Sequence, residues 1–238
     1  MKLSIVIPAF NEERLLPGTL RSIRAAIDNC SSECEIIVVN NASFDGTAEI
    51  AAEAGAIVLD ESIRNIGRVR NTGAGQANGN VLIFIDADTQ VPDILFRLIE
   101  TELSEPLCFG GSVVVEYGRF ERWWMRFYSM GWNFWGKVFN MKGGAAQFCI
   151  ASAFEQLKGY DETIFLGEDV EFYWRLADLA KKEGGYLKFI EEAKVRTSTR
   201  RFDKMSIWKT LIITNPIYIL FRSKTASAWK DWYENAVR

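Results

Sequence analysis

The chain has 238 residues, of which 48% are hydrophobic and 25% charged, and its formal net charge is −3. This composition is typical of a globular protein with a substantial core, and it argues against nucleic acid as a partner, because nucleic-acid affinity comes largely from Lys and Arg. The chain contains no histidine, which excludes Ser-His-Asp and Cys-His catalysis and the usual zinc sites. Acid–base chemistry therefore falls to carboxylate, Lys, Tyr or Cys side chains.

The first half of the chain predicts strands that alternate with helices. Four short apolar runs are typical of buried strands: 3–10, 35–41, 56–60 and 81–85. Three segments between these runs predict helices: 16–27, 45–55 and 69–78. This alternation is typical of βαβ units on a parallel sheet, in which ligands bind beyond the carboxyl ends of the strands.

Polar residues follow all four predicted strands. They are Asn11 and Glu12, Asn40 and Asn41, Asp60 and Glu61, and Asp86 and Asp88. Surface turns favour Asn and Asp, which is the alternative explanation for any single pair. Four such pairs in succession favour a binding site along one edge of the sheet. Because residues two apart on an extended strand point to the same side, Asp86 and Asp88 are expected to share one cation.

A further helix is predicted in the second half. Apolar residues from Val170 to Ala180 recur at spacings of three and four, and Lys181 and Lys182 precede a glycine at the expected end. Glu168 and Asp169 stand at the start of this helix. Acids at this position commonly stabilise only the helix dipole, so a structural role is the alternative to a functional one.

Four segments, in this order and at this spacing, resemble the family 2 glycosyltransferases of the GT-A fold. They are SIVIPAFNEE, VVNNASFDGT, RNIGRVRNTGAGQANGNVLIFIDADTQVP and LKGYDETIFLGEDVEFYWRL, and they cover about residues 3–180. The resemblance implies a Rossmann-like α/β fold with a mostly parallel sheet flanked by helices. It implies one domain with a nucleotide-sugar-binding half (1–110), an acceptor-binding half with the general base (111–200) and a helical C-terminal extension (201–238).

The resemblance also implies a site for the sugar donor, a UDP- or GDP-sugar. Asp88 would be the direct ligand of a Mn or Mg ion that bridges the donor's diphosphate, and Asp86 would serve the ribose or the water shell of the metal. The remaining residues of this pocket would be Pro8, Phe10, Glu12, Asn41, Arg70 and Ala87. In that pocket the forked donors of Arg70 would contact the base or the phosphates.

On the acceptor side, the resemblance makes Asp169 the general base that removes a proton from an acceptor hydroxyl. Glu168 would orient the acceptor, and the reaction would proceed by direct displacement with inversion. The accepting group would be a hydroxyl or a phosphate, on a glycan or a lipid-linked molecule. The stretch 119–139, which contains four Trp residues, is either a packed insertion or a surface for such an acceptor.

Two departures from the family pattern leave questions open. Asn40 and Asn41 stand where the family usually has paired acids, and an amide can both accept and donate, so the base is not decided. The family's late histidine on the metal is missing, and Arg200 and Arg201 could contact the diphosphate instead, or form a solvated surface. An alternative function is therefore a catalytically inactive, nucleotide-sugar-binding partner subunit.

The expected location is the cytoplasm. The chain starts with a strand-like run instead of a signal peptide, no segment approaches the ~20 apolar residues of a membrane span, and the four cysteines form no CxxC pair. Trp208, Trp229 and Trp232 stand among lysines near the end of the sequence. This pattern is typical of segments that lie on a membrane surface, and it adds peripheral contact with the inner face of a membrane as an alternative expectation.

Overall fold

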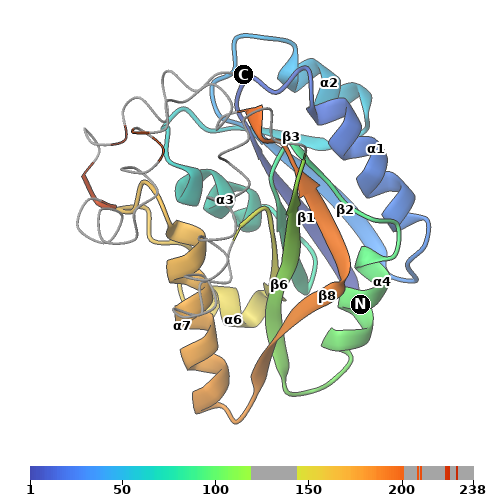
Figure 1. The fold of residues 1–238 in the computed structure, drawn as a ribbon, viewed down its shortest axis with the longest axis vertical. Helices are drawn as coiled ribbons and strands as arrows, with labels where there is room; N and C mark the ends of the chain where they lie inside the picture. Colours follow the sequence, from blue (N-terminus) through green and yellow to red (C-terminus); the bar gives the residue numbers. More distant parts are fainter. Residues whose placement is uncertain (119–143, 201–207, 209, 211–222, 226–228, 230–238) are drawn as a thin grey trace.

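A computed structural model describes residues 1–118, 144–200, 208, 210, 223–225 and 229, and its centre is one eight-stranded sheet (Figure 1). The strands are β1 (Lys2–Ala9), β2 (Glu33–Asn40), β3 (Ile57–Asp60), β4 (Val81–Ile85), β5 (Thr89–Gln90), β6 (Cys108–Tyr117), β7 (Ala146–Ile150) and β8 (Tyr186–Thr197). Their order across the sheet is β3-β2-β1-β4-β7-β6-β8-β5.

The first four strands form the parallel part of the sheet that the sequence predicts. β1 lies in the middle, with β2 on one side and β4 on the other, and β3 pairs with the outer side of β2. Ile5 of β1 is opposite Ile36 of β2 and Ile83 of β4. The carboxyl ends of these strands therefore meet at one edge of the sheet.

The second half adds antiparallel pairing to the same sheet. β7 lies between β4 and β6 and runs antiparallel to both, whereas β6 and β8 are parallel to each other. The short strand β5, just after Asp88, pairs antiparallel with the end of β8. The sheet is thus mixed. It is continuous from the predicted nucleotide-binding half to the predicted acceptor-binding half, because β4 and β7 are hydrogen-bonded to each other.

Helices cover both faces of the sheet (Figure 1). Their bounds are α1 (Leu16–Ile27), α2 (Thr47–Glu53), α3 (Ile66–Gly75), α4 (Leu95–Leu103), α6 (Ala151–Gln156) and α7 (Glu168–Lys182). Ile5 and Ile7 of β1 pack in one core with Leu20 of α1, whereas Val6 points to the other face and packs in a second core with Val69 of α3. The alternation of side chains along a buried strand explains why both faces need a cover.

The close approach of α3 to the sheet depends on Gly73. A Cβ atom at this position would lie 2.4 Å from Cγ1 of Val6 and 2.9 Å from Cγ2 of Val39. We expect Gly73→Ala to lower the free energy of unfolding by about 1–3 kcal/mol, because overpacking forces neighbouring groups apart. Gly75→Ala is the matched control in the same helix, because no atom lies within 4 Å of its Cβ position.

This control should leave stability unchanged or raise it by up to about 1 kcal/mol, through helix propensity alone. Urea unfolding of the two variants measures both effects. Equal stabilities for the two variants would contradict the tight contact between α3 and the sheet.

Some predictions fall on parts of the chain that the structure does not describe. The Trp-rich stretch 119–139, Arg201 and most of the helical extension 201–238 lie outside the described residues. Within the described segments, no helix combines the length and the apolarity that crossing a bilayer requires.

Candidate active site

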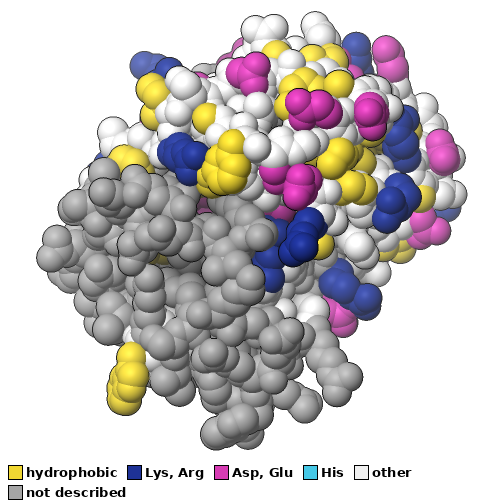
Figure 2. Space-filling model, turned by 90° about the horizontal axis from the view of Figure 1, so that it is seen from above, with side chains coloured by type: hydrophobic (Ala, Val, Ile, Leu, Met, Phe, Trp, Pro, Cys, Tyr) yellow, Lys and Arg dark blue, Asp and Glu magenta, His cyan; other side chains and the backbone are white. Residues whose placement is uncertain are grey.

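The polar residues that follow the parallel strands lie along the carboxyl edge of the sheet, as predicted. Asn40 at the end of β2 donates a hydrogen bond to Oδ1 of Asp60 at the end of β3 (2.8 Å), and the backbone N–H of Asn41 donates to the carbonyl oxygen of Ala9 (2.7 Å). In the view from above, acidic and basic side chains are interspersed over the described part of the surface (Figure 2). The edge therefore offers both charges to a ligand.

Asp86 and Asp88 lie in a turn and not on an extended strand, which differs from the prediction. β4 ends at Ile85, and the N–H of Thr89 donates to the carbonyl oxygen of Asp86 (3.1 Å). The two carboxylates consequently have different partners. Oδ1 of Asp86 accepts from Arg70 (2.9 Å), and Oδ1 of Asp88 accepts from the hydroxyl of Thr197 (3.2 Å).

Arg70 of α3 lies between the two predicted halves of the site. It is only 3% exposed, and its guanidinium contacts both Asp86 and Oε1 of Glu168, the latter at 2.5 Å. Burial works against the charge of Arg70, but the carboxylates of Asp86 and Glu168 raise its pKa above the ordinary value, so it stays protonated. Arg70 therefore links two acids, and the contact to base or phosphate that the family resemblance implies stays a prediction.

The predicted acceptor-side acids stand at the start of α7. Gly167 precedes the helix with a φ of 82°, a left-handed conformation that favours glycine. Glu168 is buried, and burial raises its pKa above the usual range while Arg70 acts in the opposite direction. Asp169 is half-buried. Glu168 is thus committed to Arg70, and Asp169 is the more accessible of the two acids.

A second arginine, Arg200, lies beside the carboxylates of Glu12 and Asp88. Arg200, just after β8, contacts the carboxylate of Glu12 and lies 3.8 Å from Oδ2 of Asp88. The backbone N–H of Glu12 donates to the hydroxyl of Thr47 (2.7 Å), which fixes the loop after β1. Arg200 is partly buried beside these acids, so it is not a fully solvated surface residue, and its contact to the diphosphate stays a prediction.

Aromatic and aliphatic residues complete the predicted nucleotide pocket. The guanidinium of Arg64 lies 3.6 Å from the ring centroid of Phe10, and Phe44, which is 83% exposed, meets Phe10 edge-on at 6.1 Å between centroids. Pro8 lies within β1, and Ala87 is buried in the turn between the two aspartates. Aromatic rings and guanidinium groups both stack on nucleobases, so this group of side chains has the chemistry to contact the base of a nucleotide.

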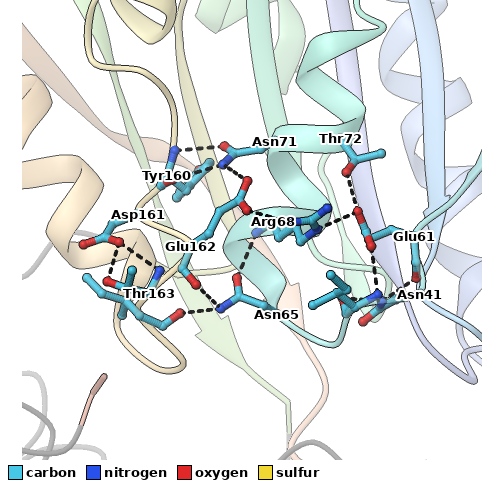
Figure 3. A network of polar contacts seen from close by, with 12 residues as sticks. Asn41, Glu61, Asn65, Arg68, Asn71, Thr72, Tyr160, Asp161, Glu162 and Thr163 are labelled. Carbon is cyan, nitrogen blue, oxygen red and sulfur yellow. Dashed lines mark hydrogen bonds and ion pairs between the residues drawn. The ribbon is translucent and has the colours of Figure 1, made fainter. Parts of the chain in front are cut away.

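Asn41 is held by the backbone of the segment after β3 (Figure 3). Its Nδ2 donates to the carbonyl oxygens of Glu61 (2.7 Å) and Ile63 (3.0 Å). The carboxylate of Glu61 in turn accepts from Nε of Arg68 (3.0 Å), and Nη1 of Arg68 donates to the carboxylate of Glu162 (3.2 Å). Because both N–H groups of the amide are used, the carbonyl oxygen is the group that Asn41 can offer to a ligand.

The helix α3 also holds the loop that leads to α7 (Figure 3). Asn65 at its start donates to the carbonyl oxygens of Glu162 and Ile164, both at 2.9 Å. Asn71 donates to the carbonyl oxygen of Tyr160 (3.0 Å) and accepts from its N–H (2.9 Å). These two asparagines belong to the RNIGRVRN segment, but sequence reasoning assigned them no role.

Asp86 and Asp88, in the turn between β4 and β5, are the residues that could hold a magnesium or manganese ion. Asp86 and Asp88 present carboxylate oxygens, the ligands that these ions prefer. Across the described residues, no three Asp, Glu, Cys or His side chains gather at one point, so these two acids would share the ion with groups of another kind. A bound cation would replace part of the positive charge that Arg70 and Arg200 bring to the acids.

The family model for glycosyl transferase family 2 matches residues 4–165, which include the ends of the parallel strands, the aspartate turn and most of the loop before α7. The chain belongs to glycosyl transferase family 2. The match confirms the resemblance inferred from the four sequence segments.

Among curated proteins, this family 2 chain is similar to the undecaprenyl-phosphate 4-deoxy-4-formamido-L-arabinose transferase of Aeromonas hydrophila. The two are 34% identical over 111 residues, which are 42% of this chain and 33% of the relative. The matched part thus spans about a third of the relative's length.

Two solved glycosyltransferase structures share the fold. A mannosyltransferase from Pyrobaculum calidifontis, in complex with GDP-mannose and Mn²⁺, superposes with a TM-score of 0.62 at 19% identity and covers 82% of this chain and 56% of its own. Glucosyl-3-phosphoglycerate synthase from Mycobacterium tuberculosis, in complex with Mn²⁺, UDP and glucosyl-3-phosphoglycerate, has a TM-score of 0.62 at 16% identity. The match covers 94% of this chain and 80% of the synthase. These likenesses confirm the GT-A fold of this family 2 chain.

Proposed function

We propose that this protein transfers a sugar from a UDP- or GDP-sugar to an acceptor with inversion at the anomeric carbon, with the help of a divalent cation. One observation carries the proposal. Arg70 joins Asp86, at the tip of the predicted donor strand, to Glu168, at the start of the predicted acceptor helix. The two predicted groups of acids therefore meet at one place on the carboxyl edge, where α/β proteins bind their ligands.

In the proposed reaction, Asp169 accepts the proton of an acceptor hydroxyl. The hydroxyl oxygen forms a bond to the anomeric carbon, and the bond from that carbon to the phosphate oxygen breaks. The nucleoside diphosphate leaves with the electron pair of that bond. Asp86 and Asp88 would hold a Mn or Mg ion, which supplies positive charge for the departing diphosphate.

Asn41 supports a donor with a ring N–H, as in uracil or guanine. Its two amide N–H groups bind the carbonyl oxygens of Glu61 and Ile63, so it presents an acceptor and no donor. An acidic side chain at this position would present the same kind of group. Asn41 in place of the family's acid would therefore still accept a hydrogen bond from the ring N–H of the base, but this bond would be weaker than one to a carboxylate.

The acceptor class is a separate proposal. The Aeromonas hydrophila relative is named for transfer involving undecaprenyl phosphate, which supports a lipid-linked acceptor and peripheral contact with a membrane. The accessible carboxylate of Asp169 supports a hydroxyl group as the nucleophile, because a base is useful only where a proton must be removed.

The proposal is tested by binding and turnover with a panel of donors. UDP-, GDP- and TDP-sugars are added with and without MnCl₂, and the unfolding temperature and the released nucleoside diphosphate are measured. A donor present at 100 times its Kd should stabilise the native state by about 2.7 kcal/mol. Mn²⁺-dependent stabilisation without turnover would favour the alternative, an inactive nucleotide-sugar-binding subunit, and no stabilisation by any donor would overturn both functions.

A further inference from the structure

Gln147 of β7 is a buried polar residue with both ends of its amide in use. The residue is 4% exposed. Its Nε2 donates to the backbone carbonyl oxygen of Asp169 (2.9 Å), and its Oε1 accepts from the hydroxyl of Tyr160 (3.1 Å). A buried side chain is therefore hydrogen-bonded to the main chain of the proposed general base.

The strand that carries Gln147 is fixed to the strand that leads to the aspartate turn. β7 pairs antiparallel with β4, and Gln147 is directly opposite Phe84, two residues before Asp86. The N–H of Asp86 itself donates to the carbonyl oxygen of Ala145, next to the start of β7 (3.1 Å). Any shift of β7 would thus move the donor side and the acceptor side of the site together.

Arg70 makes a second connection between the aspartate turn and the start of α7. It binds Asp86 and Glu168, while the β4–β7 ladder and Gln147 connect Asp86 to the residue after Glu168. Tyr160 lies next to these contacts, because the centroid of its aromatic ring is 5.3 Å from the guanidinium carbon of Arg70. Two independent routes therefore set the separation between the aspartate turn and the start of α7.

We propose that Gln147 is a positioning residue for the transfer reaction, which holds the backbone of Asp169 so that its carboxylate stays in reach of the nucleophile. This inference rests on the proposed function. A general base must lie within hydrogen-bond reach of the proton it removes, and a misplacement of about 1 Å can lower the rate roughly 10²-fold. Gln147 does not touch the donor side directly, so its loss should affect turnover and spare donor binding.

The test uses Gln147→Met, which keeps the length of the side chain and removes both hydrogen bonds. We expect kcat for nucleoside diphosphate release to fall roughly 10- to 100-fold. The KM of the donor and the Kd of UDP or GDP in the presence of Mn²⁺ should stay within about twofold. Hydrogen exchange of backbone amides in 168–175 should become faster. Gln156→Met, at an exposed position at the end of α6, is the matched control and should change none of these quantities.

Tyr160→Phe removes only the hydrogen bond that orients the amide of Gln147. We expect a smaller fall in kcat, about 3- to 10-fold, again with an unchanged Kd. If Gln147→Met does not fold, Tyr160→Phe tests the positioning role of Gln147 in its place.

Three results would overturn the inference. They are an unchanged kcat in a folded Gln147→Met protein, an equal loss of nucleotide binding and turnover, and, where Gln147→Met does not fold, a Tyr160→Phe variant with wild-type kcat. Failure of the proposed function would look different, because the wild-type protein itself would then bind neither UDP nor GDP with Mn²⁺. In that case an unchanged exchange rate in 168–175 of Gln147→Met would still refute the structural part of the inference.

Discussion

Asp88→Asn should lower turnover roughly 10²–10³-fold, the usual effect of removing one electrostatic group that stabilises a departing anion. The amide has nearly the same shape as the carboxylate, and its oxygen can still accept from the hydroxyl of Thr197, which lies 3.2 Å from Oδ1 in the native structure. The turn should therefore remain folded while its negative charge is lost. Titration calorimetry of UDP or GDP, with and without MnCl₂, should show that the metal-dependent part of the binding disappears.

Asp93→Asn is the control for this experiment. Asp93 is exposed and stands five residues after Asp88, so the same chemical change there should leave binding and turnover as they are. If Asp88→Asn kept Mn²⁺-dependent nucleotide binding, the cation would have to bind elsewhere, and the donor site assigned to the turn would be wrong.

Asp169→Asn should reduce transfer to a hydroxyl acceptor by roughly 10²–10⁴-fold, the contribution that a positioned general base typically makes. Nucleotide binding with Mn²⁺ should be unchanged, because Asp169 lies on α7, whereas the proposed donor pocket consists of the loops after β1, β2 and β4. Turnover and calorimetry on the same preparation separate the two effects. Asp178→Asn, at an exposed position on the same helix, is the control that tests for general damage to α7.

The same variant also identifies the class of the acceptor. A phosphate monoester is largely ionised at neutral pH, since its second pKa is about 6, and it needs no base to become a nucleophile. Donor consumption with undecaprenyl phosphate that survives in Asp169→Asn would therefore point to a phosphate acceptor and remove the role proposed for Asp169. A loss of activity with every acceptor, including water, would support a hydroxyl nucleophile.

The first half of the fold could be predicted because its signals are local. Each of the first four strands contains a continuous apolar run, and α1 is found at the residues where the sequence predicts it, Leu16–Ile27. The helix α3 begins three residues earlier than predicted, because Asn65 caps it by accepting from the N–H of Arg68 (2.9 Å). Sequence periodicity does not reveal such a cap when Gly and Arg occupy the first turn.

The second half of the sheet and the partners of the site could not be predicted in the same way. The place of β7 between β4 and β6 depends on pairing between distant residues. They are more than 60 positions apart for β4, as in Phe84 with Gln147, and more than 30 apart for β6, as in Ser112 with Gln147, and such pairing leaves no periodic pattern in the strands. The acids of the site were predicted from their motifs. Their partners were not, because Arg70 meets Glu168 across 98 positions of sequence and Gln147 is one polar residue in an apolar strand.

The position of β7 also has a consequence for the synthesis of the chain. β1 acquires both of its neighbours within the first 85 residues, but β4 has only one neighbour until residues 146–150 have left the ribosome. For that interval the growing sheet would expose a wholly apolar edge strand, VLIFI, of the kind that pairs with other chains. Slow translation between residues 85 and 150 would lengthen the exposure, and insoluble nascent protein would be its visible result.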